Sequence, residues 1–189
     1  MATYEGRILA VGSIDKIKRL IGPVTKVVDL NGKAVLPGFS DAHCHVLLFG
    51  LGLLQINLRS ATSISEIINA VNREAKLIPG DKWVRGWGYN DNKLSERRHP
   101  TRYDIDSVSH DHPVYLTHIS GHMSMVNTKA LQLAGVDKDT PDPNGGIIDR
   151  DGSGQPTGVF KESAQDLIKK VLTPFTIDEV KKALAALLL

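Results

Sequence analysis

Cysteine and long hydrophobic runs are scarce in this 189-residue sequence, and neither sign of charge dominates it. One cysteine permits no internal disulfide, which suits a reducing compartment. The apolar stretch at residues 46–54 is about half as long as a membrane-spanning helix needs to be. The first residues also lack the basic region and the long apolar core of a secretion signal. These absences predict a cytoplasmic protein without a membrane partner.

The charged residues indicate no nucleic-acid partner. Lys and Arg total 23 against 21 Asp and Glu, and they are scattered along the chain, so the formal net charge is only +2. Hydrophobic residues make up 41% and charged residues 23%, which is ordinary for a globular protein. The length predicts one domain with a small appendage.

Two histidines flank the single cysteine in LPGFSDAHCHVLL, at residues 36–48. If residues 39–46 form a strand, His43 and His45 point to the same face, with Asp41 beside them and Cys44 on the other face. Neutral imidazole is a common zinc ligand, so the pair would supply half of a metal site. An HxH pair alone is a weak signal, and two incidental histidines near a strand end are the alternative.

The residues around this pair are more specific. PGFSDAHCH resembles the PGFxDxHxH signature of the amidohydrolase superfamily. The resemblance implies that His43 and His45 hold zinc or another divalent metal, as one or two ions. It also implies that Asp41 orients these two ligands without binding the metal itself.

Periodicity and turn residues predict the following elements along the chain. Residues 7–11 should form a strand and residues 14–21 a helix, followed by strands at 26–30 and 33–36 around the turn residues Asn31 and Gly32. A short helix is expected within 47–58. Ser63 and Glu66 have capping-box spacing at the start of a helix at 63–78. Further along we expect strands at 82–89 and 113–119, helices at 101–108, 124–134 and 161–172, and a hairpin with arms at 145–149 and 158–160.

Four later blocks strengthen the resemblance and extend it over nearly the whole chain. GWGYNDNKL, RHPTRYDIDSVS, HPVYLTHISGHMSMVNTKAL and PTGVFKESA resemble, in this order, the amidohydrolase-3 branch, which is also called YtcJ-like. That branch usually has Tyr-Asp-Asp where this chain has Tyr89, Asn90 and Asp91, so the first carboxylate is missing here.

The sequence also nominates residues for a substrate pocket. Trp87, Tyr89 and Asp91 alternate onto one strand face that ends at a loop, so they could serve either core packing or a pocket; Trp83 is assigned to the core. The resemblance implies substrate binding by His122 and a pocket role for Glu162. The alternative for Glu162 is an acid that the dipole favours in the first turn of a helix.

The remaining histidines and Lys161 receive other interpretations. Gly121 argues against a helix that would carry His118 and His122 on one face as a zinc pair. His99, His110 and His112 precede prolines or lie in polar loops, so we expect them to be solvated. Lys161 is rejected as a bridging metal ligand, because the branch has that lysine in a later strand.

The expected fold class is α/β: an incomplete metal-dependent-hydrolase TIM (β/α)8 barrel, with part of a small β-sandwich domain and an α+β insertion. Residues 1–36 would belong to the β-sandwich and 37–189 to the barrel, with the insertion at about 81–160. A complete barrel needs about 250 residues. The sequence therefore reads as an N-terminal piece of a longer protein, with its catalytic Asp and later metal ligands beyond residue 189.

Two functions remain open from the sequence. The first is a metal-dependent hydrolase that acts on a non-peptide carbon–nitrogen bond of a small-molecule substrate, in an amide, formamide or cyclic amide. The second is a catalytically incompetent piece of a barrel that serves at most as a metal-binding or interaction module. Exposed strand edges of an unfinished barrel predict self-association.

Overall fold

The computed structural model describes residues 1–109 and 111–187, and the chain divides into two compact units, with the boundary after His43. The first unit holds strands β1 (Ala2–Tyr4) and β2 (Arg7–Ala10), paired antiparallel, and helix α1 (Ile14–Lys18). The predicted strand and helix in this segment are thereby confirmed, although the helix ends earlier than predicted. The predicted domains 1–36 and 37–189 remain a prediction.

The predicted hairpin at residues 26–36 is only partly correct. Its turn exists: the Lys33 N–H donates to the Leu30 carbonyl over 3.0 Å, and both Asn31 and Gly32 have positive φ. The two flanking strands are wrong, as is the predicted strand at residues 39–46. The side chains of residues 24–43 are all exposed, so no packing compensates the entropy that ordering these strands would cost.

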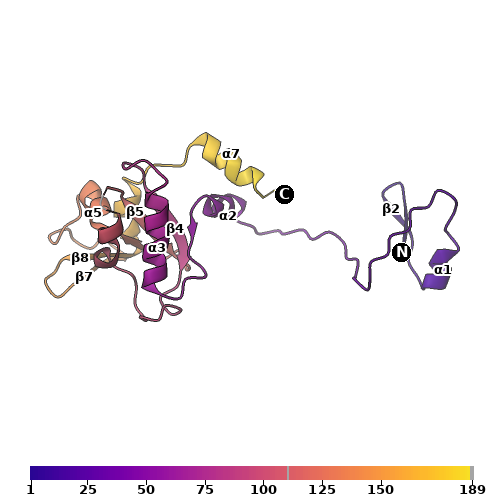
Figure 1. Ribbon diagram of the computed structural model, residues 1–189, viewed down its shortest axis with the longest axis horizontal. Helices are drawn as coiled ribbons and strands as arrows, with labels where there is room; N and C mark the ends of the chain where they lie inside the picture. Colours follow the sequence, from indigo (N-terminus) through magenta and orange to yellow (C-terminus); the bar gives the residue numbers. More distant parts are fainter. Residues whose placement is uncertain (110, 188–189) are drawn as a thin grey trace. The chain divides into compact units, whose positions relative to one another are not determined.

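The second unit is built on a six-stranded sheet with the order β3-β4-β5-β6-β8-β7 (Figure 1). Strands β3 (Ile56–Asn57), β4 (Val84–Tyr89) and β5 (Val114–His118) run parallel. The pairs of β5 with β6 (Met123–Val126), β6 with β8 (Pro156–Glu162) and β8 with β7 (Gly146–Arg150) are antiparallel. The predicted strands at 82–89 and 113–119 and the hairpin are therefore confirmed.

Helices cover both faces of this sheet. One core joins α3 (Ile64–Ala75), α4 (Arg102–Ile105) and the 3-10 helix η1 (Asp106–Val108) to the sheet through Ile67, Val71 and Leu116. A second core lies under α5 (Thr128–Ala134) and α6 (Gln165–Lys169) and contains Phe160. Helix α3 joins β3 to β4, and α4 with η1 joins β4 to β5, as in βαβ units.

The apolar helix α2 (Val46–Leu53) packs against α7 (Ile177–Ala185). A Cβ on Gly50 would lie 2.6 Å from the Ala183 carbonyl oxygen, so only glycine permits this approach. None of the helices in the two described ranges is long and apolar enough to cross a membrane.

The predicted start of α3 is correct in position. Ser63 is its N-cap, and the Glu66 N–H donates to the Ser63 hydroxyl over 3.2 Å. The Glu66 carboxylate accepts instead from the Thr62 N–H, so the reciprocal half of the capping box shifts by one residue.

Two predicted helices begin too early. Residues 124–126 lie in β6, and α5 starts only after Asn127, whose side chain caps it. Residues 161 and 162 lie in β8, and α6 starts at Gln165. Glu162 is therefore not in the first turn of a helix: it ends a strand, with a φ of 52°. In both cases pairing with distant strands outweighed the local helical pattern.

Candidate active site at the carboxyl ends of the strands

Polar side chains gather at one edge of the six-stranded sheet. Strands β4 and β5 end there, at Tyr89 and His118, which are paired in the sheet. Strand β6 begins at the same edge, because Met123 is opposite Lys161 near the end of β8. The carboxyl ends of parallel strands, with the loops that follow them, are where α/β proteins place catalytic and binding groups.

Asp91, in the loop after β4, is the centre of a half-buried cluster. One carboxylate oxygen of Asp91 lies 3.0 Å from Nε2 of His118, and the other lies 3.9 Å from Nε2 of His99. The Tyr89 hydroxyl lies 3.3 Å from Nδ1 of His99. The three rings of Tyr89, His99 and His118 meet edge to face, with centroids 5.2 to 6.0 Å apart. The cluster therefore holds a carboxylate between two imidazoles.

Burial sets the protonation of two members of this cluster. Burial raises the pKa of the Tyr89 hydroxyl well above its usual range, and the Asp91 charge adds to the shift. Burial also lowers the pKa of His99, although Asp91 acts in the opposite direction, and the nearby His118 and Lys161 lower it further. Neutral imidazole and neutral phenol are thus the favoured forms of these two side chains at pH 7.

The lowered pKa of His99 makes stability depend on pH. We expect the free energy of unfolding to fall as pH decreases from 7 to 5, because the unfolded chain takes up a proton at His99 near pH 6.5 and the folded chain resists it. His99→Gln should make this slope shallower. Urea unfolding at several pH values, followed by tryptophan fluorescence, measures both slopes. Identical slopes in the two proteins would show that His99 does not cause this pH dependence.

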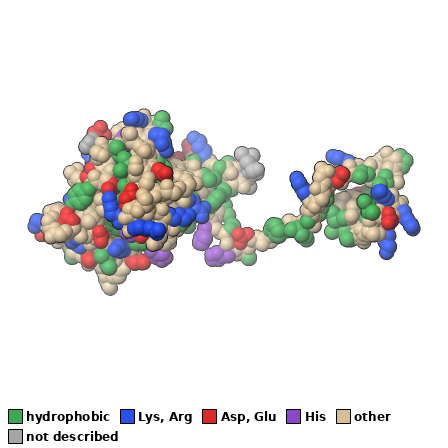
Figure 2. Space-filling view, turned by 60° about the horizontal axis from the view of Figure 1, so that its bottom comes forward, with side chains coloured by type: hydrophobic (Ala, Val, Ile, Leu, Met, Phe, Trp, Pro, Cys, Tyr) green, Lys and Arg blue, Asp and Glu red, His purple; other side chains and the backbone are tan. Residues whose placement is uncertain are grey.

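His122 and Glu162 form a second pair at the same edge. Nδ1 of His122 lies 3.0 Å from a carboxylate oxygen of Glu162, and the two side chains are 69% and 59% exposed. The Glu162 N–H also donates to the His122 carbonyl over 2.8 Å. Exposed ion pairs add little stability. The pair is therefore open to solvent and to a ligand, and histidines are visible on the surface of this unit in Figure 2.

The structure separates Trp87 and Tyr89, which were expected to share one strand face. The sheet register shifts between them, where Gly88 has a φ of 91°. Tyr89 turns into the core that contains Val84 and is fully buried. Trp87 instead donates from Nε1 to the Gly52 carbonyl in α2 over 3.0 Å. The expectation of a common face is wrong, because a bulge breaks the alternation of side chains.

The two predicted metal ligands belong to different units of the structure. His43 is the last residue of the first unit, and His45 is the N-cap residue of α2 in the second. Both are exposed. The Asp41 carboxylate accepts from the His43 backbone N–H over 2.9 Å, which fixes a turn directly before the pair.

Two imidazoles are only part of a usual set of ligands. Structural and catalytic zinc sites take three or four protein ligands. Within residues 1–109 and 111–187, no group of three or more His, Cys, Asp and Glu side chains is arranged to hold a metal ion. Imidazole is a ligand type that zinc takes, and the assignment of His43 and His45 as ligands stays a prediction.

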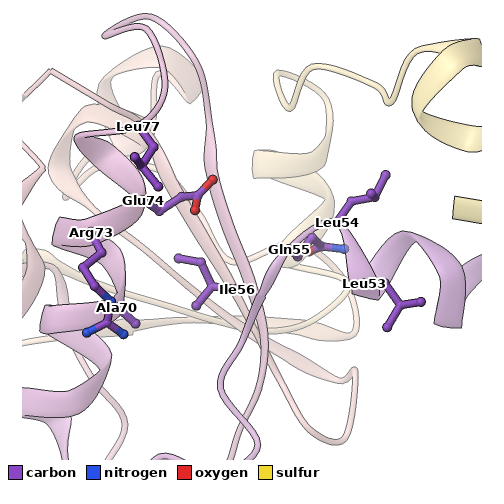
Figure 3. Close-up of a pocket in the computed structure, with 8 residues that line it drawn as sticks. All are labelled: Leu53, Leu54, Gln55, Ile56, Ala70, Arg73, Glu74 and Leu77. Carbon is purple, nitrogen blue, oxygen red and sulfur yellow. The ribbon is translucent and has the colours of Figure 1, made fainter. Parts of the chain in front are cut away.

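A groove of about 380 Å³ lies at the opposite edge of the sheet from the histidine cluster. It runs between the end of α2, the start of β3 and the last turns of α3 (Figure 3). Apolar side chains line it together with Gln55, Arg73 and Glu74. The groove holds neither histidine nor any residue nominated for the pocket, so the polar edge remains the candidate site.

Two histidines expected to be solvated are packed against other residues. His99 belongs to the half-buried cluster described above. His112 is 7% exposed, and its Nδ1 lies 3.0 Å from the Lys82 carbonyl oxygen. These two expectations are wrong, because each loop folds back onto the sheet. His110, which received the same interpretation, lies outside the described residues.

Sequence reasoning missed His99 and Ser120 as site residues and ranked His118 below His122 as a substrate-binding residue. Asp91 and His118 are 27 residues apart, and nothing in the spacing of either loop indicates their contact. Only the position of His118 at the predicted carboxyl end of a strand could have nominated it.

Comparisons with known proteins identify relatives of this chain by fold and by sequence. A solved metal-dependent hydrolase of uncharacterised function from Pyrococcus horikoshii OT3 superposes with a TM-score of 0.56 at 29% identity. The match covers 92% of this chain and 33% of that one. The sequence pattern of the amidohydrolase family matches residues 26–189.

This chain belongs to the amidohydrolase family, in its amidohydrolase-3 branch. It is 38% identical to YtcJ of Bacillus subtilis over 183 residues, which cover 96% of this chain and 35% of that protein. It is 37% identical to the N-substituted formamide deformylase of Arthrobacter pascens over 165 residues, covering 86% and 30%. The chain spans about a third of the length of these relatives.

Proposed function

We propose that this chain supplies two of the metal ligands, His43 and His45, and part of the substrate pocket of a metal-dependent hydrolase. The bond cleaved is a non-peptide carbon–nitrogen bond, in an amide, a formamide or a cyclic amide. The gathering of Asp91, His118, His122 and Glu162 at the carboxyl edge of the sheet carries the proposal. The formamide deformylase among the relatives supports this type of bond.

The fold that we propose for the whole protein is a (β/α)8 barrel. Strands β3, β4 and β5 are parallel and neighbouring, and helical segments join them in sequence, as in the successive units of such a barrel. The antiparallel strands β6, β7 and β8 would form an insertion. Residues 1–36 would contribute to a small β-sandwich.

His43 and His45 would hold the metal ion, for which zinc is the first candidate. A metal ion of this kind lowers the pKa of bound water and polarises a carbonyl group. The Asp41 carboxylate orders the turn before the two ligands through the His43 N–H. Asp41 thereby restricts where the His43 side chain can lie, as partners behind metal ligands commonly do.

The pocket residues would bind and orient the substrate. His122 and Glu162 offer an exposed donor and an exposed acceptor 3.0 Å apart, which suits the N–H and C=O groups of an amide. The φ of 52° at Glu162 costs about 1–2 kcal/mol for a residue with a Cβ, and such strain concentrates at functional sites. Asp91 would act through His118, whose Nε2 lies 3.0 Å away, with the Tyr89 ring against the His118 ring. Trp87 would line the pocket beside α2, where its Nε1 donates to the Gly52 carbonyl.

A second candidate function follows from the incomplete set of ligands. Two imidazoles bind a divalent metal more weakly than three or four ligands do. By itself, the 189-residue chain would then be a weak metal-binding module without hydrolytic activity, and its exposed apolar side chains on α2 would favour self-association.

Metal content together with hydrolysis tests the proposed function. The purified chain is loaded with zinc, dialysed, and compared with a His43→Ala/His45→Ala variant by elemental analysis. Amine and formate release from N-substituted formamides is measured in parallel. We expect zinc binding that is lost in the variant and on chelation, because both proposed ligands are removed. Hydrolysis that is lost in the same two ways would show that the chain also supplies the remaining catalytic groups.

Cys44→Ala is the matched control, since it changes the residue between the two ligands and should leave metal content unchanged. Metal content or hydrolysis that survives in the double variant would overturn the assignment of ligands. Metal binding without hydrolysis in the native chain would favour the second candidate function.

A further inference from the structure

Ser120, His118 and Asp91 form a hydrogen-bonded chain at the polar edge of the sheet, and the proposed carbon–nitrogen hydrolysis gives Ser120 no role. The Ser120 hydroxyl lies 2.8 Å from Nδ1 of His118. On the other side of the ring, Nε2 lies 3.0 Å from the Asp91 carboxylate. A hydroxyl, an imidazole and a carboxylate in this order form the arrangement that activates serine nucleophiles on unrelated folds. The two ring nitrogens are exchanged here relative to serine proteases.

The surrounding N–H groups fix where the protons lie. The Ser120 backbone N–H points at Nδ1 of His118 over 3.2 Å, so Nδ1 of the neutral ring is an acceptor. The ring proton is therefore on Nε2 and is donated to Asp91. The His122 N–H donates to the Ser120 oxygen over 3.2 Å, so this oxygen directs its own proton to Nδ1. Each bond thus favours transfer of the serine proton to the imidazole.

Packing holds the base while leaving the hydroxyl accessible. The side chain of His118 is 8% exposed and lies against the rings of Tyr89 and His99. Ser120 lies in the exposed turn between β5 and β6, which the hydrogen bond from the Gly121 N–H to the His118 carbonyl closes. A fixed imidazole beneath an exposed hydroxyl is the geometry of an activated nucleophile.

We propose that Ser120 is a nucleophile for activated acyl compounds such as aryl esters, with His118 as its general base and Asp91 orienting the ring. Ser120 Oγ attacks the acyl carbon, its proton passes to Nδ1 of His118, and the leaving aryl oxide takes that proton. The product is acyl-Ser120 and a phenol. Water, deprotonated by His118, then releases the carboxylic acid and restores the serine.

This reaction requires no metal ion, so it can be separated from the proposed carbon–nitrogen hydrolysis. All three residues lie in the second unit, whereas His43, one of the two proposed metal ligands, belongs to the first. Chelation therefore distinguishes the two activities.

The test uses a fluorophosphonate, which phosphonylates activated serines and releases fluoride, on the full 189-residue chain. Intact mass counts the labels, and peptide mapping locates them. We expect one label, at Ser120, that is absent in Ser120→Ala and unaffected by chelation. The labelling rate should fall about 100-fold or more in His118→Gln, as is typical when a general base is removed, and should also fall in Asp91→Asn. The burst of nitrophenol from p-nitrophenyl acetate should change in the same way, being absent in Ser120→Ala and reduced in His118→Gln and Asp91→Asn.

Ser153 provides the matched control. It is an exposed serine whose hydroxyl donates to a carboxylate, that of Asp151, over 2.7 Å, and no imidazole among its hydrogen-bond partners activates it. Ser153→Ala should leave labelling unchanged. The proposal is overturned by labelling of Ser120 no faster than that of Ser153, by an unchanged rate in His118→Gln, or by loss of the label on chelation. Circular dichroism of each variant checks that it folds.

Discussion

Gly158→Ala is expected to destabilise the second unit by about 4 kcal/mol or more, which is exceptional for the addition of one methyl group. Gly158 lies in β8 with a φ of 94°, where an L side chain alone costs about 1–2 kcal/mol. The added Cβ would also lie 2.2 Å from the Val126 carbonyl oxygen and 3.3 Å from the Arg102 nitrogen. Both neighbours are backbone atoms, so no side-chain rotation relieves the overlap.

Two glycines of the same hairpin separate the cost of the positive φ from the cost of the backbone overlap. Gly154 has a φ of 80° with nothing within 4 Å of an added Cβ, and Gly152 has open space without a positive φ. Gly154→Ala should therefore cost about 1–2 kcal/mol and Gly152→Ala much less. Urea unfolding followed by the fluorescence of Trp83 and Trp87 reports on this unit alone. An equal loss in Gly158→Ala and Gly154→Ala would refute the backbone overlap.

The parts of the fold that the sequence predicts correctly depend on residues close together in the chain. The helix α3 carries its own cap at Ser63 and its own apolar stripe, with Ile67 and Val71 fully buried. The β7–β8 hairpin is closed by a local turn in which the Asp151 N–H donates to the Gln155 carbonyl over 2.9 Å. Such signals lie within one short window, so reading the sequence recovers them.

The parts of the fold that the sequence predicts wrongly depend on residues that are far apart in the chain. Residues 123–126 have helical spacing with the residues that follow them, yet they pair with β5 on one side and β8 on the other. The strands expected at 26–30, 33–36 and 39–46 have suitable composition, but none of the strands in the described part of the chain pairs with them. A strand needs a partner as well as a pattern of residues.

The same distinction applies to the site. The motifs nominated Asp91, His122 and Glu162, and the structure brings the last two within 3.0 Å of each other across two strands. The sequence identifies which residue types belong to the site, but it does not predict which of their side chains contact one another. Tyr89 shows why: the shift in register after Trp87 turns its ring into the core, and strict alternation of side chains does not predict such a shift.

Asn127→Ala is expected to lower the free energy of unfolding by about 3–5 kcal/mol, the largest loss after that of Gly158→Ala. The reason is that the Asn127 side chain joins three segments of the chain. Its side-chain oxygen accepts from the Val114 N–H in β5 and from the Ala130 N–H in α5, over 3.0 and 3.1 Å. Its side-chain nitrogen donates to the Ser109 and His112 carbonyl oxygens and to the Ser109 hydroxyl. Asn127 is 1% exposed, so water does not readily replace these bonds.

Alanine would leave the Val114 and Ala130 N–H groups buried without acceptors, at about 1–3 kcal/mol for each group. Asn127→Asp should also destabilise the unit, because it keeps the acceptor but places a carboxylate oxygen against the carbonyl oxygens of Ser109 and His112. The control is Asn57→Ala, which loses one exposed hydrogen bond, to the Arg59 N–H, and should cost less than about 1 kcal/mol. If Asn127→Ala unfolds at the same urea concentration as Asn57→Ala, Asn127 does not hold these segments together. A large loss in both Asn127 variants would show that the start of β5, the loop after η1 and the cap of α5 are held as one unit by a single amide.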